Sequence, residues 1–133
     1  MIDIVKFISF AFDNGDSSWL NVFLLSEYAT AFVLEKAINE VALMNFTDQT
    51  LIDQLFEAHM WHSIHKPTEE TCQDEAFFDA CFSDRIDLIE RMLNQFKRLS
   101  PDEIALQRSI AIAQGRKGIQ ECFARFDSQQ RSS

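Results

Sequence analysis

Glycine, proline and cysteine are all scarce in this chain of 133 residues, and each shortage excludes a class of fold. Three Gly and two Pro supply little of the turn chemistry that a many-stranded sandwich or barrel needs about every ten residues. Three Cys, an odd number without a C-x-x-C pair, do not make a disulfide framework. Cys72, Cys81 and Cys122 are most simply reduced core residues, which predicts a cytoplasmic protein.

Long apolar runs and a basic leader are also missing. The longest apolar stretch, Trp19 to Leu34, is interrupted by polar residues such as Asn21 and Glu27, so we expect no transmembrane helix. The opening MIDIVKFISFAF contains Asp3 and no basic n-region. It therefore predicts a helix of the mature protein and not a signal peptide.

What the sequence does contain is helical periodicity over nearly its whole length. Hydrophobic residues make up 47% of the chain, with 13 Phe, which is enough for a buried core. We predict an all-α fold, a compact bundle of six to seven helices arranged as antiparallel neighbours or stacked helix pairs. Residues 1–127 are expected to form a single helical domain, and residues 128–133 a frayed polar tail.

Local signals set the expected helix boundaries. SPDE at 100–103 is the clearest start, because Ser caps, Pro takes the first helical position and Glu completes a capping box. Thr47 and Thr68 are expected N-caps, and Glu35 is expected on an outward face. The predicted helices are 2–12, 18–44, 48–65, one that begins after Thr68, one over about 84–98, 100–114, and a last one that ends near Phe126.

All three histidines lie in the stretch HMWHSIH, from His59 to His65. With Leu55 at zero on a helix, His59 falls at about +40° and His62 at about −20°, inside the apolar stripe, and His65 at about −80°, on its flank. One interpretation is core histidines that hydrogen-bond a carboxylate or a carbonyl. The alternative is a metal-binding protein or metal-dependent enzyme centred on His59, His62 and His65, with zinc or iron completed by a donor from another helix.

Motifs for other chemistry are not recognisable. No family signature surrounds the cysteines, so inert thiols are favoured over a nucleophile. GRKG at 115–118 lacks the spacing and the preceding strand of a phosphate loop or dinucleotide fingerprint, and indicates a helix break. An enzyme is therefore not favoured, and no cofactor is expected outside the metal alternative.

Acidic charge is concentrated in the first two thirds of the chain. Residues 1–90 hold 17 acidic side chains against four basic ones, whereas residues 91–133 hold eight basic against four acidic, for a net charge of −9. Such a surface keeps a protein soluble, repels nucleic acid and anionic membranes, and attracts basic partners. With Trp61 or Phe82 as an exposed aromatic anchor, the expected partner-binding residues are Glu69, Glu70, Asp74, Glu75, Asp79, Asp84, Asp87 and Trp61.

The stretch AFFDACFSDRIDLIERML, residues 76–93, resembles the helix-turn-helix of an ankyrin repeat. Ala80-Cys81 stands where that family has paired alanines, and Asp84-Arg85 where it has Gly-His. Residues 111–123, AIAQGRKGIQECF, repeat the frame 31 residues later, near the ankyrin period of about 33. The Thr-Pro-Leu-His opening and the β-turn finger of that family are absent, and residues 1–70 do not join the pattern. The resemblance implies a protein-binding role and no catalytic residues.

These observations together predict a non-enzymatic, acidic, helical protein of the cytoplasm that binds a basic protein partner. Binding that inhibits or neutralises the partner is one version of this role, as in an inhibitor, an immunity protein or an adaptor. Nucleic acid and membranes are not expected partners, and a homodimer is left open.

Overall fold

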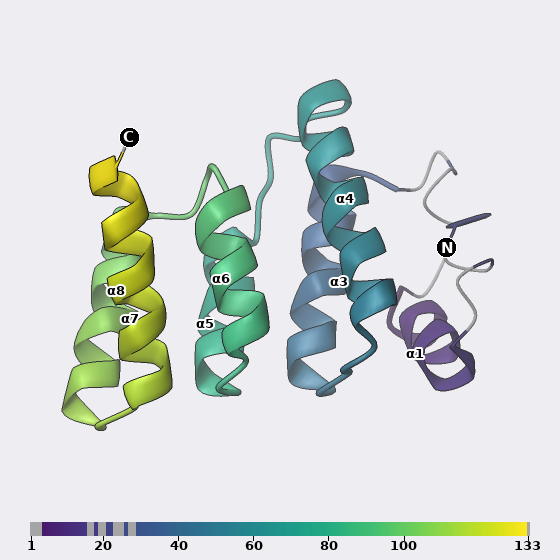
Figure 1. Cartoon of the computed structure of the whole chain (residues 1–133). Helices are drawn as coiled ribbons and strands as arrows, with labels where there is room; N and C mark the ends of the chain where they lie inside the picture. Colours follow the sequence, from purple (N-terminus) through teal and green to yellow (C-terminus); the bar gives the residue numbers. More distant parts are fainter. Residues whose placement is uncertain (1–3, 16–17, 19–20, 23–25, 27–28, 133) are drawn as a thin grey trace. The chain divides into compact units, whose positions relative to one another are not determined.

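The computed structural model describes residues 4–15, 18, 21–22, 26 and 29–132, and in these residues every regular element is a helix. The all-α prediction is therefore confirmed, with seven helices in the described part of the chain (Figure 1). The chain divides into two compact units, Met1–Cys72 and Gln73–Ser133, which we call unit 1 and unit 2.

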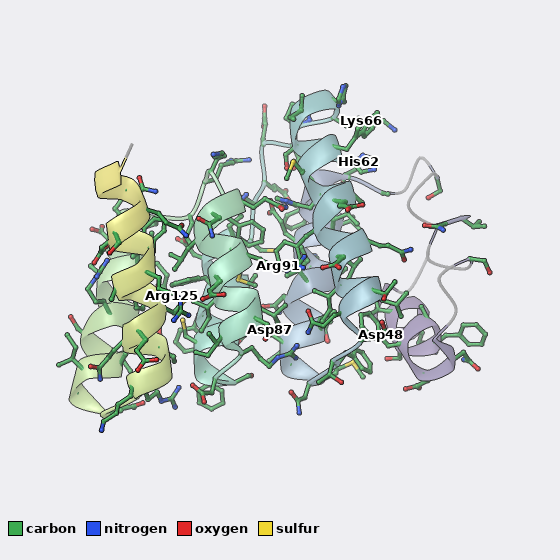
Figure 2. The ribbon with its side chains drawn as sticks, in the orientation of Figure 1. Asp48, His62, Lys66, Asp87, Arg91 and Arg125 are labelled. Atoms are coloured by element: carbon green, nitrogen blue, oxygen red, sulfur yellow. The ribbon has the colours of Figure 1, made fainter. Side chains whose placement is uncertain are left out.

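Unit 1 is built on helices α1 (Ile4–Asn14), α3 (Ala31–Leu43) and α4 (Gln49–His65). Helix α3 packs against both α1 and α4, because its buried side chains recur at helical spacing. The Asp48 carboxylate caps α4 and accepts a hydrogen bond from the Leu51 N–H at 3.2 Å (Figure 2). The cap is thus one residue after the predicted Thr47. The apolar core of this unit includes Ile8, Leu34, Ile38, Val41, Leu51, Ile52, Leu55 and Phe56.

The predicted continuous helix over residues 18–44 is wrong. Residues 29 and 30 are not helical, and the Thr30 hydroxyl accepts a hydrogen bond from the Val33 N–H at 3.2 Å, so that α3 begins afresh at Ala31. An N-cap residue with extended backbone supplies the acceptor that the first helical turn lacks. Much of the earlier half of that predicted helix, including residues 19–20 and 23–25, lies outside the described residues.

Unit 2 consists of two helix pairs, which are α5 (Gln73–Phe82) with α6 (Ile86–Gln95) and α7 (Pro101–Ala113) with α8 (Lys117–Ser132). Helix α5 packs against α7, and α6 against α8, so the two pairs lie side by side (Figure 1). The Ser100 hydroxyl accepts the N–H groups of Asp102 at 3.1 Å and Glu103 at 3.3 Å. The start of α7 predicted from SPDE is confirmed.

Other predicted boundaries in this region need correction. Helix α5 begins at Gln73 and not directly after Thr68. Thr68 is therefore not its N-cap, and the Thr68 hydroxyl donates a hydrogen bond to the Glu70 carbonyl at 2.9 Å. Helix α6 ends at Gln95, before the predicted 98. Helix α8 continues past Phe126 to Ser132, and so takes in residues that we assigned to the polar tail.

The same type of turn connects the two helices of each pair in unit 2. Asp84 and Gly115, 31 residues apart, have φ angles of 57° and 65°. The Arg85 N–H donates to the Ala80 carbonyl and the Arg116 N–H to the Ala111 carbonyl, both at 2.9 Å. This is the Schellman arrangement, in which a residue in the left-handed region ends a helix and satisfies its last carbonyls. In unit 1, Asn45 (φ 56°) ends α3 in the same way, with a hydrogen bond from Phe46 to Val41 at 3.1 Å.

Three side-chain hydrogen bonds link α5 to the chain that follows α6. The Gln73 carbonyl oxygen Oε1 accepts the Arg98 N–H at 2.8 Å, and the Asp74 carboxylate accepts the Ser100 N–H at 2.8 Å. At the other end, the Arg116 guanidinium donates to the Cys81 carbonyl at 2.7 Å. The starts of α5 and α7 therefore lie together, and so do their ends, which means that these two helices run in the same direction.

The shared turn gives a prediction about stability. Replacing Gly115 with Ala places a Cβ where no atom lies within 4 Å, so the cost is the left-handed backbone alone, about 1 kcal/mol. We expect Gly115→Ala to lower the free energy of unfolding by that amount. Asp84→Gly at the equivalent position is expected to raise it, by roughly 0.5 kcal/mol. Urea unfolding followed by circular dichroism measures both, and equal effects of the two substitutions would contradict the equivalence of the turns.

Candidate interaction surface

His59 and His62 lie in the core of unit 1, as their angular positions predict. Their residues are 1% and 4% exposed. His59 Nε2 lies 2.9 Å from Oε2 of Glu35 on α3. A buried carboxylate needs hydrogen-bond donors, and the imidazole is one of several that Glu35 has.

Glu35 is 2% exposed, so the prediction that it faces outward is wrong. Its other oxygen, Oε1, accepts the Thr71 hydroxyl at 2.8 Å and the Cys72 N–H at 3.0 Å. We call Glu35, His59, Thr71 and Cys72 the Glu35 cluster. It joins α3, α4 and the last residues of unit 1 through one carboxylate.

A local signal for Glu35 was present in the sequence. With Ile38 at zero, Glu35 falls at about +60° and Ala42 at about +40°, and Ala42 is also buried. The angular count that located the histidines therefore also places Glu35 in the apolar stripe. Its donors lie 24 to 37 residues away in the chain, which is why periodicity alone did not identify the cluster.

The Glu35 cluster does not have the geometry of a catalytic relay. The Ser63 hydroxyl lies 3.4 Å from His59 Nε2, the same nitrogen that meets Glu35. In an acid–imidazole–hydroxyl triad the two groups engage opposite ring nitrogens, so that a proton can cross the ring. Ser63 instead donates to the His59 carbonyl at 2.7 Å. The cluster is best explained as a structural element.

The structure does not bring the three histidines together as metal ligands. His65 is exposed, its ring stacks on Trp61 with 4.3 Å between centroids, and its Nδ1 lies 2.9 Å from the Trp61 carbonyl. Within the part of the chain that the structure describes, no three His, Cys, Asp or Glu side chains converge as a metal site. His59 and His62 thus face the core of unit 1, whereas His65 lies on the exposed part of α4.

The predicted partner-binding acids are spread over both units. Trp61, Glu69 and Glu70 are exposed in unit 1, whereas the other members belong to unit 2. Among those, Asp74 accepts the Ser100 N–H at 2.8 Å, and Asp87 pairs with the buried Arg85 at 2.9 and 3.1 Å. Asp84 occupies the turn before α6. Glu75 and Asp79 lie one turn apart on α5.

A pocket of about 260 Å³ opens between α6 and α8. Arg125 on α8 extends toward Glu90 on α6, and its Nε donates to that carboxylate at 2.8 Å (Figure 2). Cys122 also lines the pocket, and burial raises the pKa of its thiol to about 11. A neutral thiol and a self-compensated ion pair offer neither a nucleophile nor an excess charge for a ligand.

The most distinctive surface of unit 2 is apolar and spans α5 and α7. Phe82 is 69% exposed and Phe78 45%, and their rings stack with centroids 6.5 Å apart. On α7, Ile112 is 65% exposed and Leu106 49%. We define the α5–α7 face as Phe78, Phe82, Ala105, Leu106, Ser109, Ile112 and Ala113, all of which are exposed.

The side chains of this face lie in rows along α5 and α7. Ser109 and Ala113 are the 31-residue equivalents of Phe78 and Phe82, so small side chains on α7 occupy the positions that aromatic ones occupy on α5. Asp74 reaches toward α7 through its bond to Ser100. Glu75 and Asp79 therefore occupy the opposite margin of α5, since they lie on the other side of the phenylalanines on the helix.

The charges on these two helices are predominantly acidic. Helix α5 carries three acids and no base. On α7 the one base is Arg108, which makes two hydrogen bonds to Asp127 of α8 at 2.7 and 3.1 Å. Lys97 and Arg98 lie in the connection before α7, at the starting end of the face. The aromatic residues of the face are thus bordered by a row of carboxylates.

The acids of this surface, and Phe82 as an alternative anchor to Trp61, were predicted from the sequence, whereas Phe78, Leu106 and Ile112 were not. The signal for the phenylalanines was their i, i+4 spacing on the acidic side of α5, outside the stripe formed by Ala76, Phe77 and Ala80.

Comparisons with known protein families, with curated proteins and with solved structures find no match for this chain. None of the described helices is both long and apolar enough to cross a membrane.

The Glu35 cluster predicts a large and specific loss of stability. Glu35→Ala removes the shared acceptor of His59, Thr71 and Cys72, and each buried donor that loses its acceptor costs about 1–3 kcal/mol. The control Glu40→Ala alters a half-buried carboxylate on the same helix and is expected to cost about 0.5 kcal/mol or less. Tryptophan fluorescence reports this unit, since Trp19 and Trp61 both precede Gln73. Similar urea midpoints for the two variants would contradict the role of Glu35.

The buried thiols of unit 2 predict a dependence on alkaline pH. Burial raises the pKa of Cys81 from 9.0 to about 12, and that of Cys122 from 9.0 to about 11. A raised folded-state pKa stabilises the fold fully below the unfolded value, and this contribution is lost as pH rises from about 9 toward 11 and 12. We expect the free energy of unfolding to fall over that range, with a shallower slope in Cys81→Ala. Native protein near pH 8 should react slowly with a thiol reagent, and rapid labelling of Cys81 would contradict its burial.

Proposed function

We propose that this chain is a protein-interaction module that binds a basic protein partner. The observation that carries the proposal is the α5–α7 face, where a stacked and exposed phenylalanine pair lies beside Glu75 and Asp79. Exposed apolar patches on folded proteins mark interaction sites. Aromatic anchors with a charged border give affinity and steering respectively.

The proposed partner is basic because the charge of the molecule favours it. The chain carries a net charge of −9, and the bases of unit 2 are largely engaged, as in Arg85 with Asp87 and Arg125 with Glu90. A positively charged protein would be attracted over a distance. It would not compete for its binding site with these bases of the chain, because they are already paired with other acids. An inhibitor, an immunity protein or an adaptor is the type of role that this chemistry fits.

The resemblance to ankyrin repeats supports the same proposal. The two turns at Asp84 and Gly115 have matching hydrogen bonds at a spacing of 31 residues. Stacked helix pairs present extended surfaces that bind proteins.

We place the protein in the cytoplasm, because Cys72, Cys81 and Cys122 are free and buried thiols, the state that a reducing compartment maintains.

A charge-reversal pair tests this proposal. The partner is captured from the native host with the purified chain, identified by mass spectrometry, purified and titrated by calorimetry. Glu75→Lys on α5 is expected to weaken binding about tenfold, which corresponds to about 1.4 kcal/mol. The matched control Glu121→Lys, an equally exposed acid on α8, is expected to change it by less than about twofold.

Salt dependence provides the second readout. Binding is expected to weaken as the salt concentration rises, since exposed charges are screened over roughly 10 Å at 0.1 M ionic strength. A partner that is itself acidic, or one that loses equal affinity with Glu75→Lys and Glu121→Lys, would overturn the proposed function.

A further inference from the structure

The α5–α7 face has the dimensions and the layout of a helix-binding surface. Helix α7 contains 13 residues, about 20 Å of length. Along α5 the side chains are large and aromatic, whereas on α7 a row of small side chains, Ala105, Ser109 and Ala113, lies between the larger Leu106 and Ile112. A ridge next to a row of small side chains accepts the side chains of a third helix, which packs by placing ridges into grooves.

The charge pattern specifies which helix. The acids Glu75 and Asp79 border the aromatic residues on the margin away from α7, and helical spacing places a third exposed acid, Asp102, at the start of the exposed row of α7. A matching helix therefore has an apolar stripe with basic residues along one flank. A second copy of this chain is a poor match, because the same acidic margin on both copies would face like charge.

We propose that the α5–α7 face binds an amphipathic helix of the partner protein, about four turns long, with a Leu-type apolar stripe and a Lys- or Arg-rich flank. This inference rests on the proposed function and adds the form of the bound segment. Phe78 and Phe82 insert into the apolar stripe of that helix, Leu106 and Ile112 contact it from the two edges of the exposed side of α7, and Glu75 and Asp79 meet its basic flank. Recognition of amphipathic helices by exposed apolar surfaces is a common mode of peptide binding.

A synthetic peptide tests the inference on the full-length chain. The probe is a helix of about 18 residues with leucine on one stripe and lysine elsewhere. Its control is a scrambled peptide of the same composition, with equal charge and no amphipathic face. We expect saturable shifts in the 15N–1H spectrum that are confined to α5 and α7, with binding at least tenfold weaker for the scrambled peptide.

The exposed apolar residues offer a matched pair of variants. Phe82→Ser and Ile64→Ser remove side chains of nearly equal exposure, 69% and 70%, from unit 2 and unit 1. We expect Phe82→Ser to weaken peptide binding at least tenfold and Ile64→Ser to leave it unchanged, with both spectra retaining folded dispersion. Shifts outside α5 and α7, equal binding of the scrambled peptide, or equal effects of the two variants would overturn the inference.

Two further outcomes identify other occupants. A concentration-dependent dimer that Phe82→Ser abolishes would make a second copy the occupant, and shifts that spread over α3 and α4 in the free Phe82→Ser variant would make unit 1 the occupant. Either result overturns the inference. If the native partner is lost with Glu75→Lys but retained with Phe82→Ser, the helix inference fails and the proposed function stands.

Discussion

The carboxylate of Glu35 is the constraint on which the organisation of unit 1 depends. A polar group in the interior is tolerated only where it has hydrogen-bond partners, and this one meets an imidazole, a hydroxyl and a backbone N–H. Those donors come from α4 and from Thr71 and Cys72. One side chain thus holds two helices together and fixes the segment that ends the unit.

The same carboxylate explains why α5 begins where it does. The residues after Pro67 look like a helix start, with Thr68 before two glutamates. Instead the chain is not helical from the end of α4 to Cys72, whose N–H donates to Glu35. Only then does Gln73 begin a helix, at the boundary between the two units.

Much of the fold could be predicted from the sequence, because its signals are local. SPDE sets the start of α7, and helical spacing places His59 and His62 in the core.

The predictions that failed have a common physical cause. Thr30 could not be recognised as a break, since apolar residues continue on both sides of it. Glu35 was assigned outward because its donors belong to distant parts of the chain. The acids at 69–87 were found as a group, yet their division between units and between bonded and exposed positions depends on the tertiary structure. The apolar surface as a whole was missed for the related reason that exposure of Phe78, Leu106 and Ile112 is decided by what packs against α5 and α7.

The bond from Arg116 to the carbonyl of Cys81 has a consequence for how unit 2 is assembled during synthesis. Residue 81 emerges from the ribosome well before residue 116, so the end of α5 acquires this donor only when the second pair arrives. The links at Gln73 and Asp74 also wait for residues 98 and 100. A linear array of repeats can form one member at a time, with each adding its own increment of stability. Here three hydrogen bonds of the first pair are completed only by residues 98, 100 and 116, so the stability of the first pair is coupled to the presence of the second.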